Sequence, residues 1–253
     1  RHLLSHTTGL PYHAYTNLIE EGLNISEIRD HYFPKSPVCG KEGDFYAYQN
    51  AAFCITGQIM QNLTGQSYSD LLRKNILDLA GMSGTSSSYE AMEATVNKAL
   101  PHVWTGSYWL DHPISPCYYN AVEAGGINSN ITDMAQWLKI LLGNRPDIIT
   151  EQTLDQVFAP VVKTGNERRI QSGWIRREEA SYAMGWRVLE HEGDTFIYHG
   201  GYVDGFRGEI AFNRRDNIGI CMLFNGETGL SKDCIQVFFE KWKQLKHPEV
   251  LSK

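Results

Sequence analysis

The sequence lacks an apolar run near the roughly 20 residues that a membrane-spanning helix needs, so we predict no transmembrane segment. Basic residues are also fewer than acidic ones: the chain has 23 Lys and Arg residues and 29 Asp and Glu residues, which gives a net charge of −6. This balance argues against nucleic acid, and against an anionic membrane surface, as a partner. The five cysteines form no C-x-x-C pair, and their odd number leaves at least one thiol without a disulfide.

Several catalytic signatures are absent as well. No G-x-S-x-G run occurs, which excludes the nucleophile turn of α/β-hydrolases. Neither G-x-x-x-x-G-K-[ST] nor G-x-G-x-x-G is present, so no phosphate-binding loop is predicted. His2 and His6 have the spacing of two zinc ligands on a helix, but Leu3 occupies the position where zinc hydrolases carry Glu. We therefore predict neither a metal site nor a cofactor.

The first residues, R-H-L-L-S-H-T-T-G-L-P, include no initiator Met and no apolar signal-peptide core. We expect the natural N-terminus, with any targeting information, to lie before Arg1. The 253 residues suit one large domain or two small ones and can bury a substantial core, and the motifs described below favour a single domain over 1–253.

Apolar periodicity predicts an α+β architecture, with a mainly helical region over 45–160 and strands followed by a helix over 182–253. The expected helices are 48–62, a helix capped by Ser67, 134–142, and a short helix capped by Thr150. The expected strands are 184–191, 194–199, 207–213 and 217–224. Short turns separate these strands, which indicates an antiparallel meander. Residues 84–130 show little periodicity, and a long irregular segment of this kind is often functional.

The last expected helix, 231–246, is apolar along one face. That face carries Ile235, Phe238, Phe239, Trp242 and Leu245. Such a helix must cover apolar surface, and the preceding strands are the nearest candidate. We therefore expect it to pack on the antiparallel sheet.

The stretch Y-H-G-G-Y-V-D-G-F-R-G, 198–208, places four glycines between two expected strands. Glycine weakens a strand and often marks a bulge or a place where another backbone or a ligand comes close. The approaching group is either another strand or a substrate, and the composition of this stretch does not decide between them.

Six motifs, taken in their order along the chain, point to a substrate as the group that approaches these glycines, because they resemble the motifs of a known enzyme family. They are H-L-L-S-H-T-T-G-L-P, A-Y-Q-N followed by A-A-F-C-I-T-G-Q-I-M, L-A-G-M-S-G-T-S, A-G-G-I-N-S-N-I-T-D-M-A-Q-W-L, Y-A-M-G-W-R-V and H-G-G. Together they resemble the serine β-lactamase/penicillin-binding superfamily, in particular its class C β-lactamase, D-Ala-D-Ala carboxypeptidase and esterase members. The motifs cover nearly the whole chain, and their order makes the resemblance specific.

The resemblance implies roles for two residues at the start of the first expected helix. Tyr48 matches the family tyrosine that shuttles a proton between nucleophile and leaving group. Asn50 matches the residue that binds the substrate's carbonyl and steadies the catalytic lysine. An ordinary tyrosine has a pKa of about 10, so this role requires a nearby cation. The alternative is that Tyr48 and Asn50 have no catalytic role and only form the start of a helix, with the tyrosine ring packed behind it.

The resemblance also implies that His199-Gly200-Gly201 is the strand motif that is K-T-G in many members and H-x-G in others. An acyl substrate would lie along this strand as an added β-strand, with Gly200 and Gly201 keeping side chains out of its path. The backbone N–H of Tyr202 would be one oxyanion donor. His199 in place of lysine implies only partial charge near neutral pH, which favours peptidase or esterase chemistry over efficient β-lactam hydrolysis. Arg207 is either a substitute cation or a surface arginine.

The nucleophile of this family is the serine of S-x-x-K, and no serine of the 253 residues has lysine three positions later. We expect this motif to lie before Arg1, which leaves the chain inactive on its own. The implied activity is hydrolysis of an amide or ester through an acyl-enzyme, on a small-molecule or peptidoglycan-like substrate. A periplasmic or cell-envelope location is implied by the family. The alternative is a non-catalytic domain that binds such a substrate or peptide.

Overall fold

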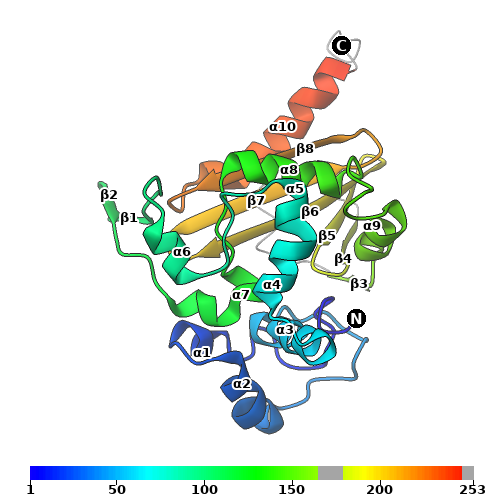
Figure 1. Cartoon of the computed structure of the whole chain (residues 1–253). Helices are drawn as coiled ribbons and strands as arrows, with labels where there is room; N and C mark the ends of the chain where they lie inside the picture. The colour runs from blue at the N-terminus through cyan, green and yellow to red at the C-terminus, as the bar shows by residue number, and fades with distance from the viewer. Residues whose placement is uncertain (165–178, 247–253) are drawn as a thin grey trace.

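A six-stranded antiparallel sheet forms the centre of the chain in the computed structural model, which describes residues 1–164 and 179–246 (Figure 1). The strands follow one another in the order β3-β4-β5-β6-β7-β8. Their bounds are β3 Val162–Lys163, β4 Glu179–Tyr182, β5 Arg187–His191, β6 Asp194–Val203, β7 Phe206–Asn213 and β8 Ile218–Phe224. The predicted α+β class and the antiparallel meander are confirmed.

Helices precede the sheet along the chain and one long helix follows it. They are α1 Thr16–Glu20, α2 Ile25–Glu27, α3 Asn50–Thr64, α4 Tyr68–Leu72, α5 Asp78–Ala80, α6 Tyr89–Ala94, α7 Val122–Gly125, α8 Ile131–Leu141, α9 Glu151–Phe158 and α10 Leu230–Lys246. A π-helical turn, Arg73–Leu77, joins α4 to α5, and a 3₁₀ turn, Cys117–Ala121, leads into α7. None of the described helices is long and apolar enough to cross a membrane.

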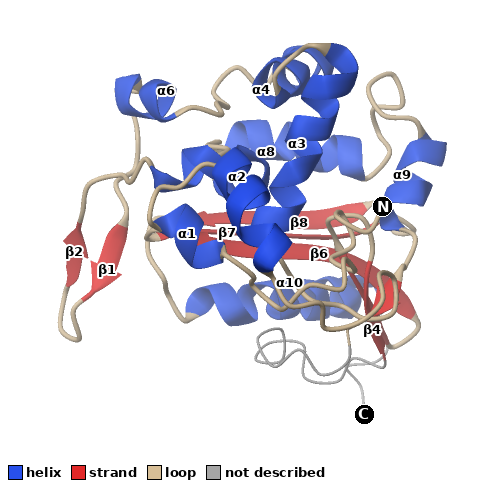
Figure 2. Cartoon of the chain, turned by 90° about the horizontal axis from the view of Figure 1, so that it is seen from below, coloured by secondary structure: helices blue, strands red, loops and turns tan. Residues whose placement is uncertain are grey.

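Each face of the sheet has its own apolar core. Figure 2 shows α10 on one side of the sheet and α3 and α8 on the other. On the α10 face, Ile235 and Phe239 are each 3% exposed and pack against residues of the strands, which confirms the predicted covering helix. Leu245 was assigned to the same face but is 82% exposed, because α10 extends past the edge of its contact with the sheet. On the opposite face, α8 and α9 contribute Leu141, Leu154 and Phe158.

Helix starts follow their capping residues closely. The Ser67 hydroxyl accepts from the Asp70 N–H at 3.1 Å, and the Thr150 hydroxyl accepts from the Thr153 N–H at 3.2 Å. The predicted caps of α4 and α9 are therefore confirmed. Likewise, the side chain of Asn130 accepts from the Asp133 N–H at 2.9 Å and starts α8.

Several predicted bounds differ from the structure. The helix expected from residue 48 begins at Asn50, because Gln49 keeps an extended backbone as the N-cap. Within 84–130 a small hairpin was missed, in which β1 His102–Trp104 pairs with β2 Trp109–Asp111. The strand expected to end at 199 runs on to Val203, since β7 pairs with it through the glycines.

Candidate active site

The strand β6 extends beyond the end of its neighbour β5, and this leaves a free strand edge. Pairing of β5 with β6 ends at Tyr198, whereas pairing of β6 with β7 continues to Val203. Within the described residues, 199–203 of β6 therefore have no strand on the side away from β7. We call this side of residues 199–203 the open edge.

The register decides which backbone groups face the open edge. In an antiparallel ladder, successive residues direct their N–H and C=O alternately to one neighbouring strand and to the other. Val203 and Phe206 close the turn between β6 and β7, so 203, 201 and 199 bond to β7. Gly200 and Tyr202 then direct their backbone groups to the open edge. The predicted oxyanion donor, the N–H of Tyr202, is thus aimed where a substrate strand would lie.

The two glycines of the strand motif have different surroundings. A Cβ at Gly201 would have no atom within 4 Å, so this position borders open space. A Cβ at Gly200 would lie 2.1 Å from Glu209 Oε2, because Gly200 points to the other face of the sheet. The prediction that both glycines clear a substrate's path fits the geometry of Gly201 only. Gly200 is required by packing within the protein.

Tyr48 lies beside His199, although the two are far apart in sequence. Their ring centroids are 6.4 Å apart, and the ring of His6 lies 4.2 Å from that of Tyr48. The hydroxyl of Tyr182 lies 3.3 Å from His199 Nε2, within hydrogen-bonding distance. The fold thus gathers Tyr48 and His199 at the beginning of the open edge. Asn50 follows on the first turn of α3 and is half-buried.

His6 is a residue of this site that sequence reasoning missed as such. Its imidazole is 2% exposed, and its Nδ1 accepts from the backbone N–H of Gln49 at 3.1 Å. The side chain of Gln49 also donates to the carbonyl of Pro11, and the carbonyl of Tyr48 accepts from the His13 N–H at 2.7 Å. The segment around Tyr48 is therefore fixed from the chain's first residues. A histidine so distant from Gln49 in sequence gives no local signal of this role.

Electrostatics correct the expected partial charge of His199. Burial, then the positive charge of Arg187 and the protonated form of His6, lower its pKa well below the usual value, so the imidazole is neutral at neutral pH. Arg187 itself is the cation of this cluster, with its guanidinium carbon 5.7 Å from the centroid of the Tyr48 ring. A cation thus lies over the ring of Tyr48, and sequence reasoning did not single out Arg187.

A family model described as Beta-lactamase matches residues 1–237. The chain belongs to the β-lactamase family. The match covers all six motifs and both sides of the site, and it confirms the resemblance drawn from the sequence. The catalytic and binding roles assigned to individual residues stay predictions.

Individual members of the β-lactamase family show the same relationship. The chain is 26% identical to Unguisins hydrolase ungD' of Aspergillus campestris over 216 residues, which are 83% of this chain and 39% of that protein. Its fold matches the octameric penicillin-binding protein homologue from Pyrococcus abyssi with a TM-score of 0.74 and 21% identity, covering 89% of this chain and 51% of that one. A class C beta-lactamase mutant matches with a TM-score of 0.65 and 18% identity, covering 91% and 66%. The chain spans about two fifths of the length of the curated relatives it matches.

Arg207 is not a substitute for the lysine of the family's K-T-G motif. Its Nε and a terminal nitrogen both lie 2.6 Å from Glu209 Oε1. It shares the face of Gly200 rather than that of His199, because it lies opposite Tyr202 in the register. The alternative that Arg207 neutralises a substrate carboxylate is therefore not supported.

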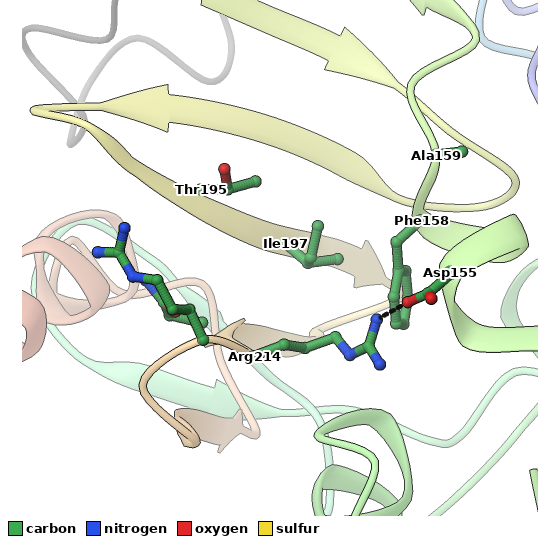
Figure 3. Close-up of a pocket in the computed structure, with 8 residues that line it drawn as sticks. Asp155, Phe158, Ala159, Thr195, Ile197 and Arg214 are labelled. Atoms are coloured by element: carbon green, nitrogen blue, oxygen red, sulfur yellow. Dashed lines mark hydrogen bonds and ion pairs between the residues drawn. The ribbon is translucent and has the colours of Figure 1, made fainter. Parts of the chain in front are cut away.

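A cavity of about 280 Å³ lies at the other end of β6, between α9 and the turn after β7 (Figure 3). Its cations already have carboxylate partners, since Arg214 pairs with Asp155 and Arg215 pairs with Asp194. No residue of the predicted site lines it. Among the described residues, no group of three or more His, Cys, Asp or Glu side chains could hold a metal ion.

Proposed function

We propose that this chain is the substrate-binding and proton-transfer part of a serine hydrolase that cleaves an amide or ester through an acyl-enzyme. The observation that carries the proposal is the position of Tyr48 and His199 at the start of the open edge. A substrate strand bound there would pair with Gly200 and Tyr202 and present its carbonyl to the N–H of Tyr202. Membership of the β-lactamase family supports this chemistry.

Each part of the site has a task in this scheme. Tyr48 takes the proton of the nucleophile during acylation and returns it to the leaving group, and the guanidinium of Arg187 lies over its ring, 5.7 Å from the centroid. Asn50 binds the carbonyl next to the scissile bond. His199 is neutral, so we assign it hydrogen bonding rather than attraction of a carboxylate. This favours a substrate without a carboxylate at that position over efficient β-lactam hydrolysis.

The nucleophile is the part of the scheme that the 253 residues do not supply. No serine among them is followed by lysine three positions later. We propose that an S-x-x-K segment outside these residues provides both groups. The greater length of the curated relatives is compatible with this proposal.

Substrate class and location belong to the same proposal. The relative named Unguisins hydrolase is a hydrolase by name, which supports hydrolysis as the reaction type. For this chain we propose a small-molecule or peptidoglycan-like peptide or ester substrate and a periplasmic or cell-envelope location. Fractionation of cells that express the tagged protein tests the location.

Covalent labelling tests the proposed function. Protein expressed from its whole coding sequence is treated with a fluorescent penicillin or a fluorophosphonate, and its intact mass is measured. The proposal expects one adduct, and peptide mapping should place it on a serine that precedes lysine by three residues. An adduct on a serine within the 253 residues would refute the assigned nucleophile. No adduct with either reagent would refute the hydrolase and support the alternative of a non-catalytic binding domain.

A further inference from the structure

Gly200 faces a buried carboxylate across the sheet. Its partner in the register is Glu209 of β7, which is only 2% exposed. A Cβ added at Gly200 would lie 2.1 Å from Glu209 Oε2 and 2.4 Å from the hydroxyl of Tyr198. Neither contact is possible for a real side chain, so the carboxylate occupies the space that a side chain at position 200 would need.

Both oxygens of this carboxylate are fixed. The Tyr198 hydroxyl donates to Glu209 Oε2 at 2.7 Å, and Arg207 Nε donates to Glu209 Oε1 at 2.6 Å. The charge-assisted bond comes from the same strand as Glu209, and the tyrosine bond comes from β6. The carboxylate therefore links β6 to β7 at Tyr198, the residue before the open edge, and lies opposite Gly200, which is part of that edge.

We propose that Glu209 is a positioning residue for the open edge. Its carboxylate occupies the side-chain space of Gly200 and, with Tyr198 and Arg207, holds residues 199–203 flat against β7. This inference rests on the proposed function, because only that function gives the open edge a substrate. It assigns Gly200 to internal support and leaves Gly201 to border the substrate.

The first test compares folding in four proteins: wild type, Gly200→Ala, Glu209→Ala and the double variant. Gly200→Ala forces a methyl group into filled space and should lower the folding equilibrium constant about tenfold or more. In the Glu209→Ala background the carboxylate is gone and the Tyr198 hydroxyl, 2.4 Å from the added Cβ, has lost the partner that holds it there, so adding Gly200→Ala should cost clearly less than it does in the wild type. Equal losses in both backgrounds would overturn the proposal, because the two positions would then be independent.

Gly201→Ala is the matched control, since a methyl group there meets no atom within 4 Å. It should fold nearly as well as wild type. If Glu209→Ala does not fold, the contrast between Gly200→Ala and Gly201→Ala still decides the matter. The same stability for these two variants would overturn the proposal.

Hydrogen exchange separates positioning from a general loss of stability. Glu209→Ala should speed exchange of the 199, 201 and 203 amides, which bond to β7, at least about tenfold more than that of the β8 amides. Glu209→Gln keeps the shape and one acceptor and should restore most of the protection. A uniform acceleration over β6 and β8 would show a merely structural residue and overturn the positioning role.

Activity completes the test in the protein expressed from its whole coding sequence. There Glu209→Ala should raise KM for an ester substrate by a larger factor than it lowers kcat, because the binding strand is displaced. If the wild-type protein forms no acyl adduct, the proposed function fails, and the folding and exchange results still test whether Glu209 positions residues 199–203. If adducts form and Glu209→Ala keeps both constants, the positioning role fails while the proposed function stands.

Discussion

Removing the imidazole of His6 should flatten the pH dependence of stability on the acid side. His6 is 2% exposed and packs between Tyr48 and Tyr182, where a positive charge is poorly solvated. Burial, together with the charges of Arg187 and His13, lowers its pKa from 6.5 to about 3. The folded chain thus holds this histidine neutral over a range in which the unfolded chain protonates it.

The sign and size follow from proton linkage. Because the folded pKa is lower than the unfolded one, the unfolded state binds more protons between pH 6.5 and about 3. The full stabilisation is therefore present above pH 6.5 and is lost progressively as the pH falls toward 3. From pH 7 to pH 5 the free energy of unfolding should fall by about 2 kcal/mol from this group alone. His199 acts in the same direction, because its pKa is lowered as well.

The assay is urea unfolding at a series of pH values for wild type and His6→Asn. The Asn side chain can still accept from the Gln49 N–H, but it does not titrate. The variant loses ring packing at every pH, whereas the difference between the two curves should shrink by about 2 kcal/mol from pH 7 to pH 5. His31→Asn, at an exposed histidine, controls for the loss of any imidazole. Parallel curves for wild type and His6→Asn would refute the reasoning.

Other outcomes follow from single contacts. Tyr48→Phe in the protein expressed from its whole coding sequence should slow acylation at least about 10²-fold in stopped-flow measurements, and an unchanged rate would remove its assigned role. Phe239→Ala should cost about 3–5 kcal/mol in chemical unfolding, since Phe239 is 3% exposed, whereas Val237→Ala on the exposed side of α10 should cost little. Asn130→Ala and Thr150→Ala should each cost about 1 kcal/mol by removing a helix cap, and a wild-type midpoint for either would show that its cap bond contributes nothing.

Local signals predicted the main helices and four of the six sheet strands, but gave no sign of β3 and β4. Period and turn residues predicted β7, β8 and α10 closely, because each of these elements is amphipathic or apolar over its whole length. The helix caps at Ser67 and Thr150 could be predicted because each cap hydrogen bond joins residues within one helical turn. The β1–β2 hairpin was not readable, since strands so short carry no periodic pattern.

The site was predictable only in part, for a physical reason. Tyr48, His199 and the glycines were found through motifs, which record residue types along the chain. His6 and Arg187 act on Tyr48 only after folding brings distant segments together, and neither has a local pattern that reveals it. The end of β6 was misjudged for the same reason. Glycine lowers strand propensity, but pairing with β7 outweighs that cost through Val203.

Buried polar groups hold the backbone on both flanks of the open edge. On one side His6 holds the N–H of Gln49 and so fixes Tyr48. On the other side Glu209 holds Tyr198 and excludes a side chain at Gly200. An unpaired buried polar group is costly, so each of these contacts is made in full or the local structure is lost. Substitutions at His6 and Glu209 should therefore shift Tyr48 and the strand residues 199–203 well before they disturb the two apolar cores of the sheet.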